Sequence, residues 1–165
     1  MPMLLKGSCS CGAVRFEMKS HTPVPYQLCY CSICRKQQGG GGYAINLAGI
    51  YNTLKVEGEE HLGLYRATIC DEETPRPEVS SGERRFCKQC GSALWLYDPT
   101  WPHLMHPFAS AIDSELPTAP QRVHLMLKYK ASWVEPDIRP GDTAFDLYPP
   151  DSIAGWHKHH GLWVE

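Results

Sequence analysis

Seven of the eight cysteines in this 165-residue chain fall into three tight clusters, and this clustering constrains the fold more than any other sequence feature. The clusters are Cys9-Ser10-Cys11-Gly12, Cys29-Tyr30-Cys31-Ser32-Ile33-Cys34 and Cys87-Lys88-Gln89-Cys90-Gly91. Short gaps between thiols are typical of zinc sites, whereas cysteines that serve only as small core residues are scattered. The clusters therefore predict bound zinc. Cys70 stands alone, and we expect a structural role for it.

Two of the clusters end in Cys-Gly, the form of a zinc knuckle in which glycine allows a tight turn beside the sulfurs. If these two knuckles pair, Cys9, Cys11, Cys87 and Cys90 complete a site with four thiolates. A closed four-thiolate site is structural and couples metal binding to folding. We therefore expect this site to join the first strand to the middle of the chain.

That pairing leaves Cys29, Cys31 and Cys34 as three ligands with an open fourth position. Three protein ligands and one exchangeable ligand are the pattern of a catalytic zinc. Two alternatives remain open at this point. The cluster could close with Cys70 or a histidine and be structural, or it could be a redox trio without metal.

The ligand type favours thiol chemistry at the open site. Three thiolates donate much negative charge to zinc, so activation of water for hydrolysis is not the first expectation. A coordinated thiol is deprotonated and remains nucleophilic, which favours a thiol substrate that attacks an electrophilic carbon. Arg35 and Lys36 follow the cluster directly and are candidates to bind the substrate's carboxylates, with a solvated surface charge as the alternative for each.

Alternating apolar and polar residues, separated by prolines and glycines, predict a mainly β, largely antiparallel fold in one domain spanning residues 1–165. We expect short helical segments at 33–38 and, behind an Asp151-Ser152 cap, at 153–160 near the C-terminus. Residues 39–42 and 71–83 are expected to be loops. The predicted strands lie at 14–18, 43–47, 53–57, 61–66, 93–97, 106–110 and 123–130, and those between 43 and 66 should begin a meander.

Charge and hydropathy exclude several partners. The formal charge of −2 gives no general reason to expect nucleic acid. No apolar run approaches the roughly 18 residues of a membrane span, and the apolar part of the first seven residues is too short for a signal peptide. We expect a soluble, cytoplasmic protein without a membrane partner, and exposed aromatic residues in the C-terminal third are compatible with a homodimer.

Three stretches carry a family resemblance: Gly7-Ser8-Cys9-Ser10-Cys11-Gly12-Ala13-Val14, Cys29-Tyr30-Cys31-Ser32-Ile33-Cys34-Arg35-Lys36 and Arg85-Phe86-Cys87-Lys88-Gln89-Cys90-Gly91-Ser92. In these residues the sequence resembles the glutathione-dependent formaldehyde-activating enzyme (GFA) family, which includes centromere-protein-V-like members. Weaker matches are Ile112-Asp113, His124 with Ser132-Trp133, and Trp156-His157. For His124 we expect a structural histidine rather than a general base.

The resemblance implies a small zinc-binding β fold of the β-tent type. It also implies a structural zinc on Cys9, Cys11, Cys87 and Cys90 and a second, catalytic zinc on Cys29, Cys31 and Cys34. The family's named activity adds glutathione to formaldehyde and gives S-hydroxymethylglutathione, a carbon–sulfur lyase reaction in reverse. Two alternatives stand beside it: a non-catalytic zinc module that binds protein or nucleic acid, and an enzyme of this fold that uses a different thiol or aldehyde.

Overall fold

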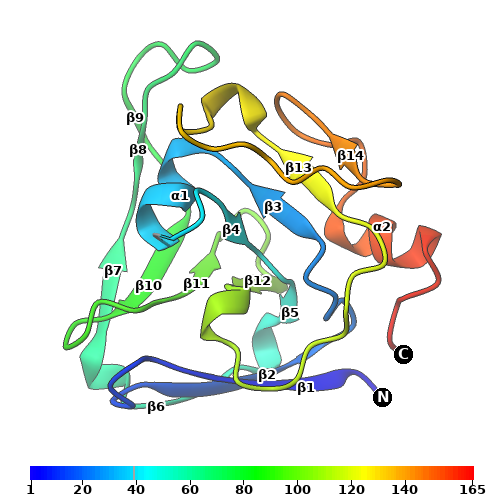
Figure 1. Cartoon of the computed structure of the whole chain (residues 1–165). Helices are drawn as coiled ribbons and strands as arrows, with labels where there is room; N and C mark the ends of the chain where they lie inside the picture. The colour runs from blue at the N-terminus through cyan, green and yellow to red at the C-terminus, as the bar shows by residue number, and fades with distance from the viewer. Residues whose placement is uncertain (39) are drawn as a thin grey trace.

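The structure is a computed structural model that describes residues 1–38 and 40–165. It is mainly β, as predicted, with three sheets, a small two-stranded hairpin and two short α-helices (Figure 1). Gly39, the first residue of the expected glycine loop, lies outside the described residues, and Gly40 to Gly42 form a turn. None of the helices in the described ranges has the length and apolar character needed to cross a membrane.

The first sheet has three strands in the order β1-β2-β6. β1 and β2 form an antiparallel hairpin whose turn contains the first cysteine knuckle. Phe16 and Met18 point into the core from β2, which confirms the strand predicted there, whereas β1 was not predicted. The strands span Met3–Ser8 (β1), Arg15–Ser20 (β2) and Lys55–Glu57 (β6).

The second sheet has five strands in the order β5-β12-β11-β10-β7. β10 and β11 form a hairpin that holds the second cysteine knuckle, so the two knuckles occupy equivalent positions in two hairpins. The main core lies between these hairpins, where the Phe16 and Trp95 rings meet edge to face at 5.0 Å. The strands span Gly49–Ile50 (β5), Leu62–Tyr65 (β7), Glu83–Cys87 (β10), Ala93–Tyr97 (β11) and Leu104–Pro107 (β12).

The third sheet has four strands in the order β14-β13-β3-β4, and β13 runs parallel to both β3 and β14. β3 leads directly into α1 (Ser32–Gln38), and the thiol triad sits at this junction. The strands span Gln27–Cys29 (β3), Ala44–Ile45 (β4), Val123–Leu125 (β13) and Thr143–Ala144 (β14).

The C-terminal helix confirms its predicted cap. α2 spans Ile153–His159, and the Ser152 hydroxyl accepts a hydrogen bond of 3.0 Å from the backbone N–H of Gly155. This bond satisfies one of the free N–H groups in the first helical turn. Beyond the helix, Gly161 has a φ of 67°, which is the left-handed conformation that glycine adopts readily.

The predicted meander is wrong. The three segments between 43 and 66 do form strands, but β4 pairs with β3, β6 with β2, and β7 with β10. Each segment therefore belongs to a different sheet. Short alternating strands suit any half-buried sheet surface, so their pattern does not specify which partner they take.

Two further boundaries differ from prediction. The strand predicted at 123–130 ends at Leu125, because Met126 adopts a φ of 60° and a 3₁₀ turn follows at Leu127–Tyr129. The strand predicted at 106–110 is β12, which ends at Pro107 before a 3₁₀ turn at Ala109–Ala111. In the first case alternation continues through the turn in the sequence, so the pattern alone did not reveal it.

Within the segment predicted as an exposed loop at 71–83, residues 71–77 form the tip of a small hairpin, and residues 78–79 are its second strand. β8 (Thr68–Ile69) pairs with β9 (Glu78–Val79), and the hairpin projects from the body of the molecule in Figure 1. Lys128 binds its tip through the carboxylates of Glu72 at 2.7 Å and Glu73 at 2.9 Å. The tip is therefore held beside the turn that follows β13.

Candidate functional site

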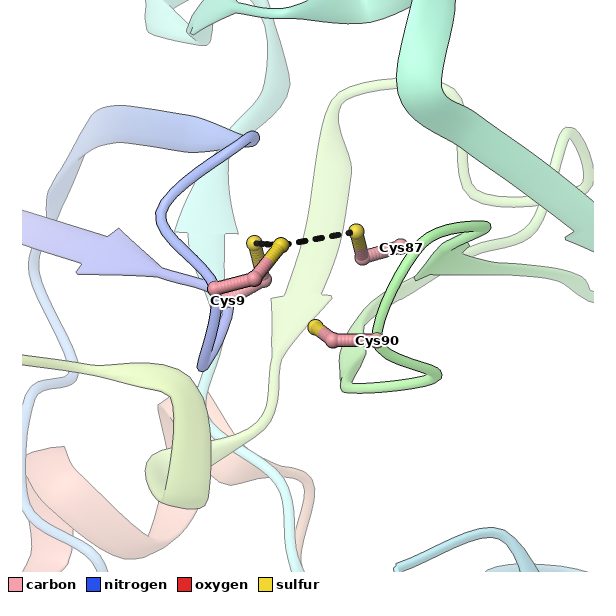
Figure 2. Close-up of side chains that lie close together, drawn as sticks. Cys9, Cys87 and Cys90 are labelled. Carbon is pink, nitrogen blue, oxygen red and sulfur yellow. Dashed lines mark hydrogen bonds between the residues drawn. The ribbon is translucent and has the colours of Figure 1, made fainter.

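Two separate groups of thiols are assembled by the fold. The Sγ atoms of Cys9, Cys11, Cys87 and Cys90 all lie within 4.8 Å of one another, although the residues come from two distant hairpins. Figure 2 shows the sulfurs of Cys9, Cys87 and Cys90 turned toward a common centre between the two knuckle loops. The pairing of knuckles that the sequence suggested is therefore present in the fold.

The two knuckles share one backbone geometry. Gly12 and Gly91 both have a φ of 78°, and each N–H donates to the carbonyl of the first cysteine of its knuckle, at 3.1 Å to Cys9 and 2.8 Å to Cys87. The N–H of Val14 also donates to the Cys9 sulfur at 3.3 Å. Backbone N–H groups aimed at sulfur favour the thiolate, which is the form that binds metals.

The spacing of these four sulfurs fits zinc. The Cys9 and Cys11 sulfurs are 3.6 Å apart, and those of Cys11 and Cys87 are 3.7 Å apart. Four sulfurs placed about 2.3 Å from a tetrahedral zinc ion lie about 3.8 Å from one another. The group can therefore hold a metal ion, and every position of a tetrahedral shell is filled by the protein.

The second group is the thiol triad, Cys29, Cys31 and Cys34, whose sulfurs also lie within 4.8 Å of one another. Cys29 ends β3, Cys31 precedes α1 and Cys34 lies in the first turn of α1. Cys29 and Cys34 are buried, whereas Cys31 is partly exposed. The local turn is set by the Cys34 N–H, which donates to the Cys31 sulfur at 3.3 Å.

The three thiols of the triad shift one another's pKa values. Hydrogen bonds from the Cys29 and Cys34 thiols lower the pKa of Cys31 to about 2, and the same contact with Cys31 raises the pKa of Cys29. These hydrogen bonds favour the thiolate form of Cys31. A metal ion would replace those protons, because thiols bind metals as thiolates.

The triad has three ligands within the described ranges 1–38 and 40–165. No fourth His, Cys, Asp or Glu side chain from those ranges joins the group. Cys70 instead lies exposed after β8, with its sulfur 3.6 Å from the carbonyl of Pro75. The arrangement of the described residues therefore favours an open shell over the alternative in which Cys70 or a histidine closes it.

Arg84 is the residue near the triad that the sequence reasoning missed. It lies on β10, and its Nη2 is 3.8 Å from the Cys34 sulfur. Only its position next to a cysteine knuckle could have drawn attention to it, because nothing in the sequence indicates which face of β10 meets α1. The guanidinium places a permanent positive charge beside the thiols.

The two substrate contacts predicted from the sequence, Arg35 and Lys36, have different environments. Arg35 is partly buried on α1, and its Nε atom is buried without a hydrogen-bond partner among the residues that the structure describes. Lys36 is exposed. Partial desolvation and then the charges of the three thiols raise the pKa of Tyr148, and 75% of the surface of this tyrosine is exposed.

A buried polar network links the strand that carries Cys29 to its neighbour β13. Tyr30 lies between Cys29 and Cys31 in the sequence. Its hydroxyl donates to His124 Nδ1 at 2.8 Å, and His124 Nε2 donates to Asp142 at 3.1 Å. His124 is fully buried with both ring nitrogens bonded, which agrees with the structural role expected for it. The network ties β3 to β13 and to the turn before β14 at the level of the cysteines.

A comparison with known protein families identifies the family of this chain. A family model described as "Glutathione-dependent formaldehyde-activating enzyme" matches residues 4–128. The chain therefore belongs to the GFA family.

A curated relative and a solved structure are also similar to this chain. The chain is 58% identical to a Halomonas elongata protein named "Putative glutathione-dependent formaldehyde-activating enzyme", over 97% of this chain and 98% of the relative. A crystal structure of a Rhodobacter sphaeroides protein aligns with 69% of this chain and 99% of its own, with a TM-score of 0.48 and 23% identity.

Proposed function

We propose that this protein is a cytoplasmic, zinc-dependent carbon–sulfur lyase of the GFA type, built as one domain over residues 1–165. It would add a small thiol such as glutathione to formaldehyde or a related aldehyde. The observation that carries the proposal is the thiol triad, which offers three thiolates and, from the described residues, no fourth ligand. Family membership and the name of the Halomonas relative support glutathione and formaldehyde as the first substrates to test.

The two groups of cysteines have different roles in this proposal. Cys9, Cys11, Cys87 and Cys90 hold a structural zinc, and Cys29, Cys31 and Cys34 hold a catalytic zinc with one exchangeable position. The catalytic zinc supplies a site where a thiol is held as the nucleophilic thiolate. The protein's own side chains position that thiol and exclude competing ligands.

The reaction forms one bond and moves one proton. The thiol sulfur attacks the aldehyde carbon, a carbon–sulfur bond forms, and the carbonyl π electrons move to oxygen. The proton released by the thiol ends on that oxygen, so the product is a hydroxymethyl thioether and no oxidant is needed. Arg35 and Lys36 are proposed to bind carboxylates of the thiol, and the unpartnered Nε of Arg35 favours it over exposed Lys36.

An assay of the zinc-loaded protein tests this function. We expect faster formation of S-hydroxymethylglutathione from glutathione and formaldehyde than in buffer, followed by NMR. Cys31→Ser should abolish the acceleration because it removes a metal ligand, whereas Cys70→Ser should retain it because Cys70 lies outside the triad. If the wild type neither binds glutathione nor accelerates the reaction, the assignment is wrong.

Metal content separates the two proposed sites. The wild type should bind two zinc ions per chain, and Cys31→Ser should bind one while it keeps its circular dichroism spectrum. Elemental analysis of the purified proteins measures this directly. Collapse of the Cys31→Ser variant would contradict the division into a structural and an exchangeable site.

A further inference from the structure

Arg84 reaches the thiol triad from the sheet opposite α1. It belongs to β10 in the five-stranded sheet, whereas Cys34 belongs to α1, fifty positions earlier in the chain. Its Nη2 lies 3.8 Å from the Cys34 sulfur. This contact places the guanidinium beside one of the three thiols that would hold the metal.

The other terminal nitrogen of Arg84 has no partner among the described residues. Nη1 is buried and makes no hydrogen bond there. The nearest acidic residue on the strand, Glu83, pairs instead with Arg66 at 3.8 Å and Arg85 at 3.6 Å. Burial of a charged donor without an acceptor is unfavourable, and such a group indicates a missing water or ligand.

We propose that Arg84 binds one carboxylate of the thiol substrate, in addition to the contacts proposed for Arg35 and Lys36, so that the site selects thiols carrying a carboxylate over neutral thiols. This inference rests on the proposed function, because it requires the thiol to occupy the fourth position of the triad. The guanidinium fork matches a carboxylate, and the bond is strong because both groups are charged. Formaldehyde carries no charge, so the selection applies to the thiol alone.

The test uses two thiols of similar size that differ in charge. The full chain is substituted with cobalt(II), and thiol binding is followed by the absorption of the metal–thiolate bond. The probes are 3-mercaptopropionate, which carries a carboxylate, and 3-mercapto-1-propanol, which does not. We expect the wild type to bind 3-mercaptopropionate about tenfold or more tightly than the neutral thiol.

Variants of Arg84 and of its neighbour separate a carboxylate contact from a structural role. Arg84→Gln should reduce the preference for 3-mercaptopropionate, with Arg35 and Lys36 still present, and leave the affinity for the neutral thiol unchanged. Arg84→Lys should retain part of the preference, because it keeps the charge but loses the fork. Arg85→Gln is the matched control, because Arg85 points to the other face of β10 and pairs with Glu83.

The outcomes separate this inference from the proposed function. The role of Arg84 would be overturned if Arg84→Gln lost affinity for both thiols equally, or if the wild type showed no preference between them. Either result would count even if glutathione and formaldehyde react. Failure of the formaldehyde reaction with an intact preference for 3-mercaptopropionate would overturn only the proposed function. If Arg84→Gln loses its metal, Arg84→Lys decides the question, since a preference for 3-mercaptopropionate as large as that of the wild type would contradict the inference.

Discussion

At the scale of single residues, Gly58 shows how closely the loops around the first knuckle are packed. It has a φ of 82°, and a Cβ atom added there would lie 1.9 Å from the carbonyl oxygen of Ala13. That carbonyl belongs to the backbone just after the knuckle and cannot rotate away as a side chain can. Gly161 has a similar φ of 67°, but nothing lies within 4 Å of its Cβ position.

These two glycines form a matched pair for substitution. Gly58→Ala should reduce the free energy of unfolding by about 3 kcal/mol or more, because backbone strain and a steric clash add together. Gly161→Ala should cost about 1 kcal/mol, because only the strain applies. Urea unfolding of both variants measures the difference, and equal losses would show that the contact with Ala13 relaxes freely.

In the thiol triad, residue spacing brings the cysteines together, whereas the orientation of a distant strand determines which charged residue lies beside them. Cys29, Cys31 and Cys34 meet because a strand end, a turn and a first helical turn follow one another within six residues. Arg84 meets them only because β10 presents that side chain toward α1. The cysteine ligands could therefore be predicted from spacing, whereas Arg84 could not.

At the scale of elements, the parallel strands β3, β13 and β14 depend on Asp142. Its carboxylate accepts hydrogen bonds from the backbone N–H of Arg122 at 2.8 Å and of Arg139 at 3.1 Å, besides the bond from His124. Burial alone would raise the pKa of Asp142, but these bonds and the charge of Arg122 lower it to about 2. The carboxylate therefore stabilises the fold in its ionised form.

The sign of this shift predicts how stability depends on pH. The folded pKa of Asp142 lies below the unfolded value of about 3.9. The contribution of its carboxylate to the free energy of unfolding is therefore complete above pH 4 and is lost as the pH falls toward 2. Asp142→Asn should lower the free energy of unfolding by about 1–3 kcal/mol at pH 7, and the gap from wild type should narrow below pH 4.

Denaturant unfolding at several pH values checks this prediction. Acid also protonates the cysteines, but it does so in both proteins, so the difference between wild type and variant isolates Asp142. Asp137→Asn is the control, because the side chain of Asp137 is 68% exposed and its change should stay within about 0.5 kcal/mol. A gap between wild type and Asp142→Asn that does not change with pH would contradict the role of the carboxylate charge.

At the scale of the whole molecule, the four-thiol group joins two sheets that share the main core. Cys11 and Cys87 are 76 positions apart in the chain, yet their sulfurs are 3.7 Å apart. Cys87 is fully buried and packs within the same core as Phe16 and Trp95. A metal bound by these thiols would close a long loop and tie the β1–β2 hairpin to the β10–β11 hairpin.

Loss of this site should therefore affect the entire fold. Cys87→Ser should lower the melting temperature strongly and reduce cooperativity, because it removes a ligand and places a hydroxyl in an apolar core. Thermal unfolding by circular dichroism measures the effect, with Cys70→Ser as the control that should melt within a few degrees of wild type. A Cys87→Ser variant that melts like the control would show that the four-thiol group has no structural role.

The sequence by itself determined the features that depend on near neighbours. Spacing over a few residues, where chain geometry leaves few options, determines four features. They are the Cys-Gly knuckles, the thiol triad, the capped C-terminal helix and the strand that follows each knuckle. The tertiary structure alone decided which strands pair, that β13 runs parallel to β3, and that Arg84 faces Cys34. Those contacts join distant segments, and packing of the whole core selects them from many partners that the same short patterns would allow.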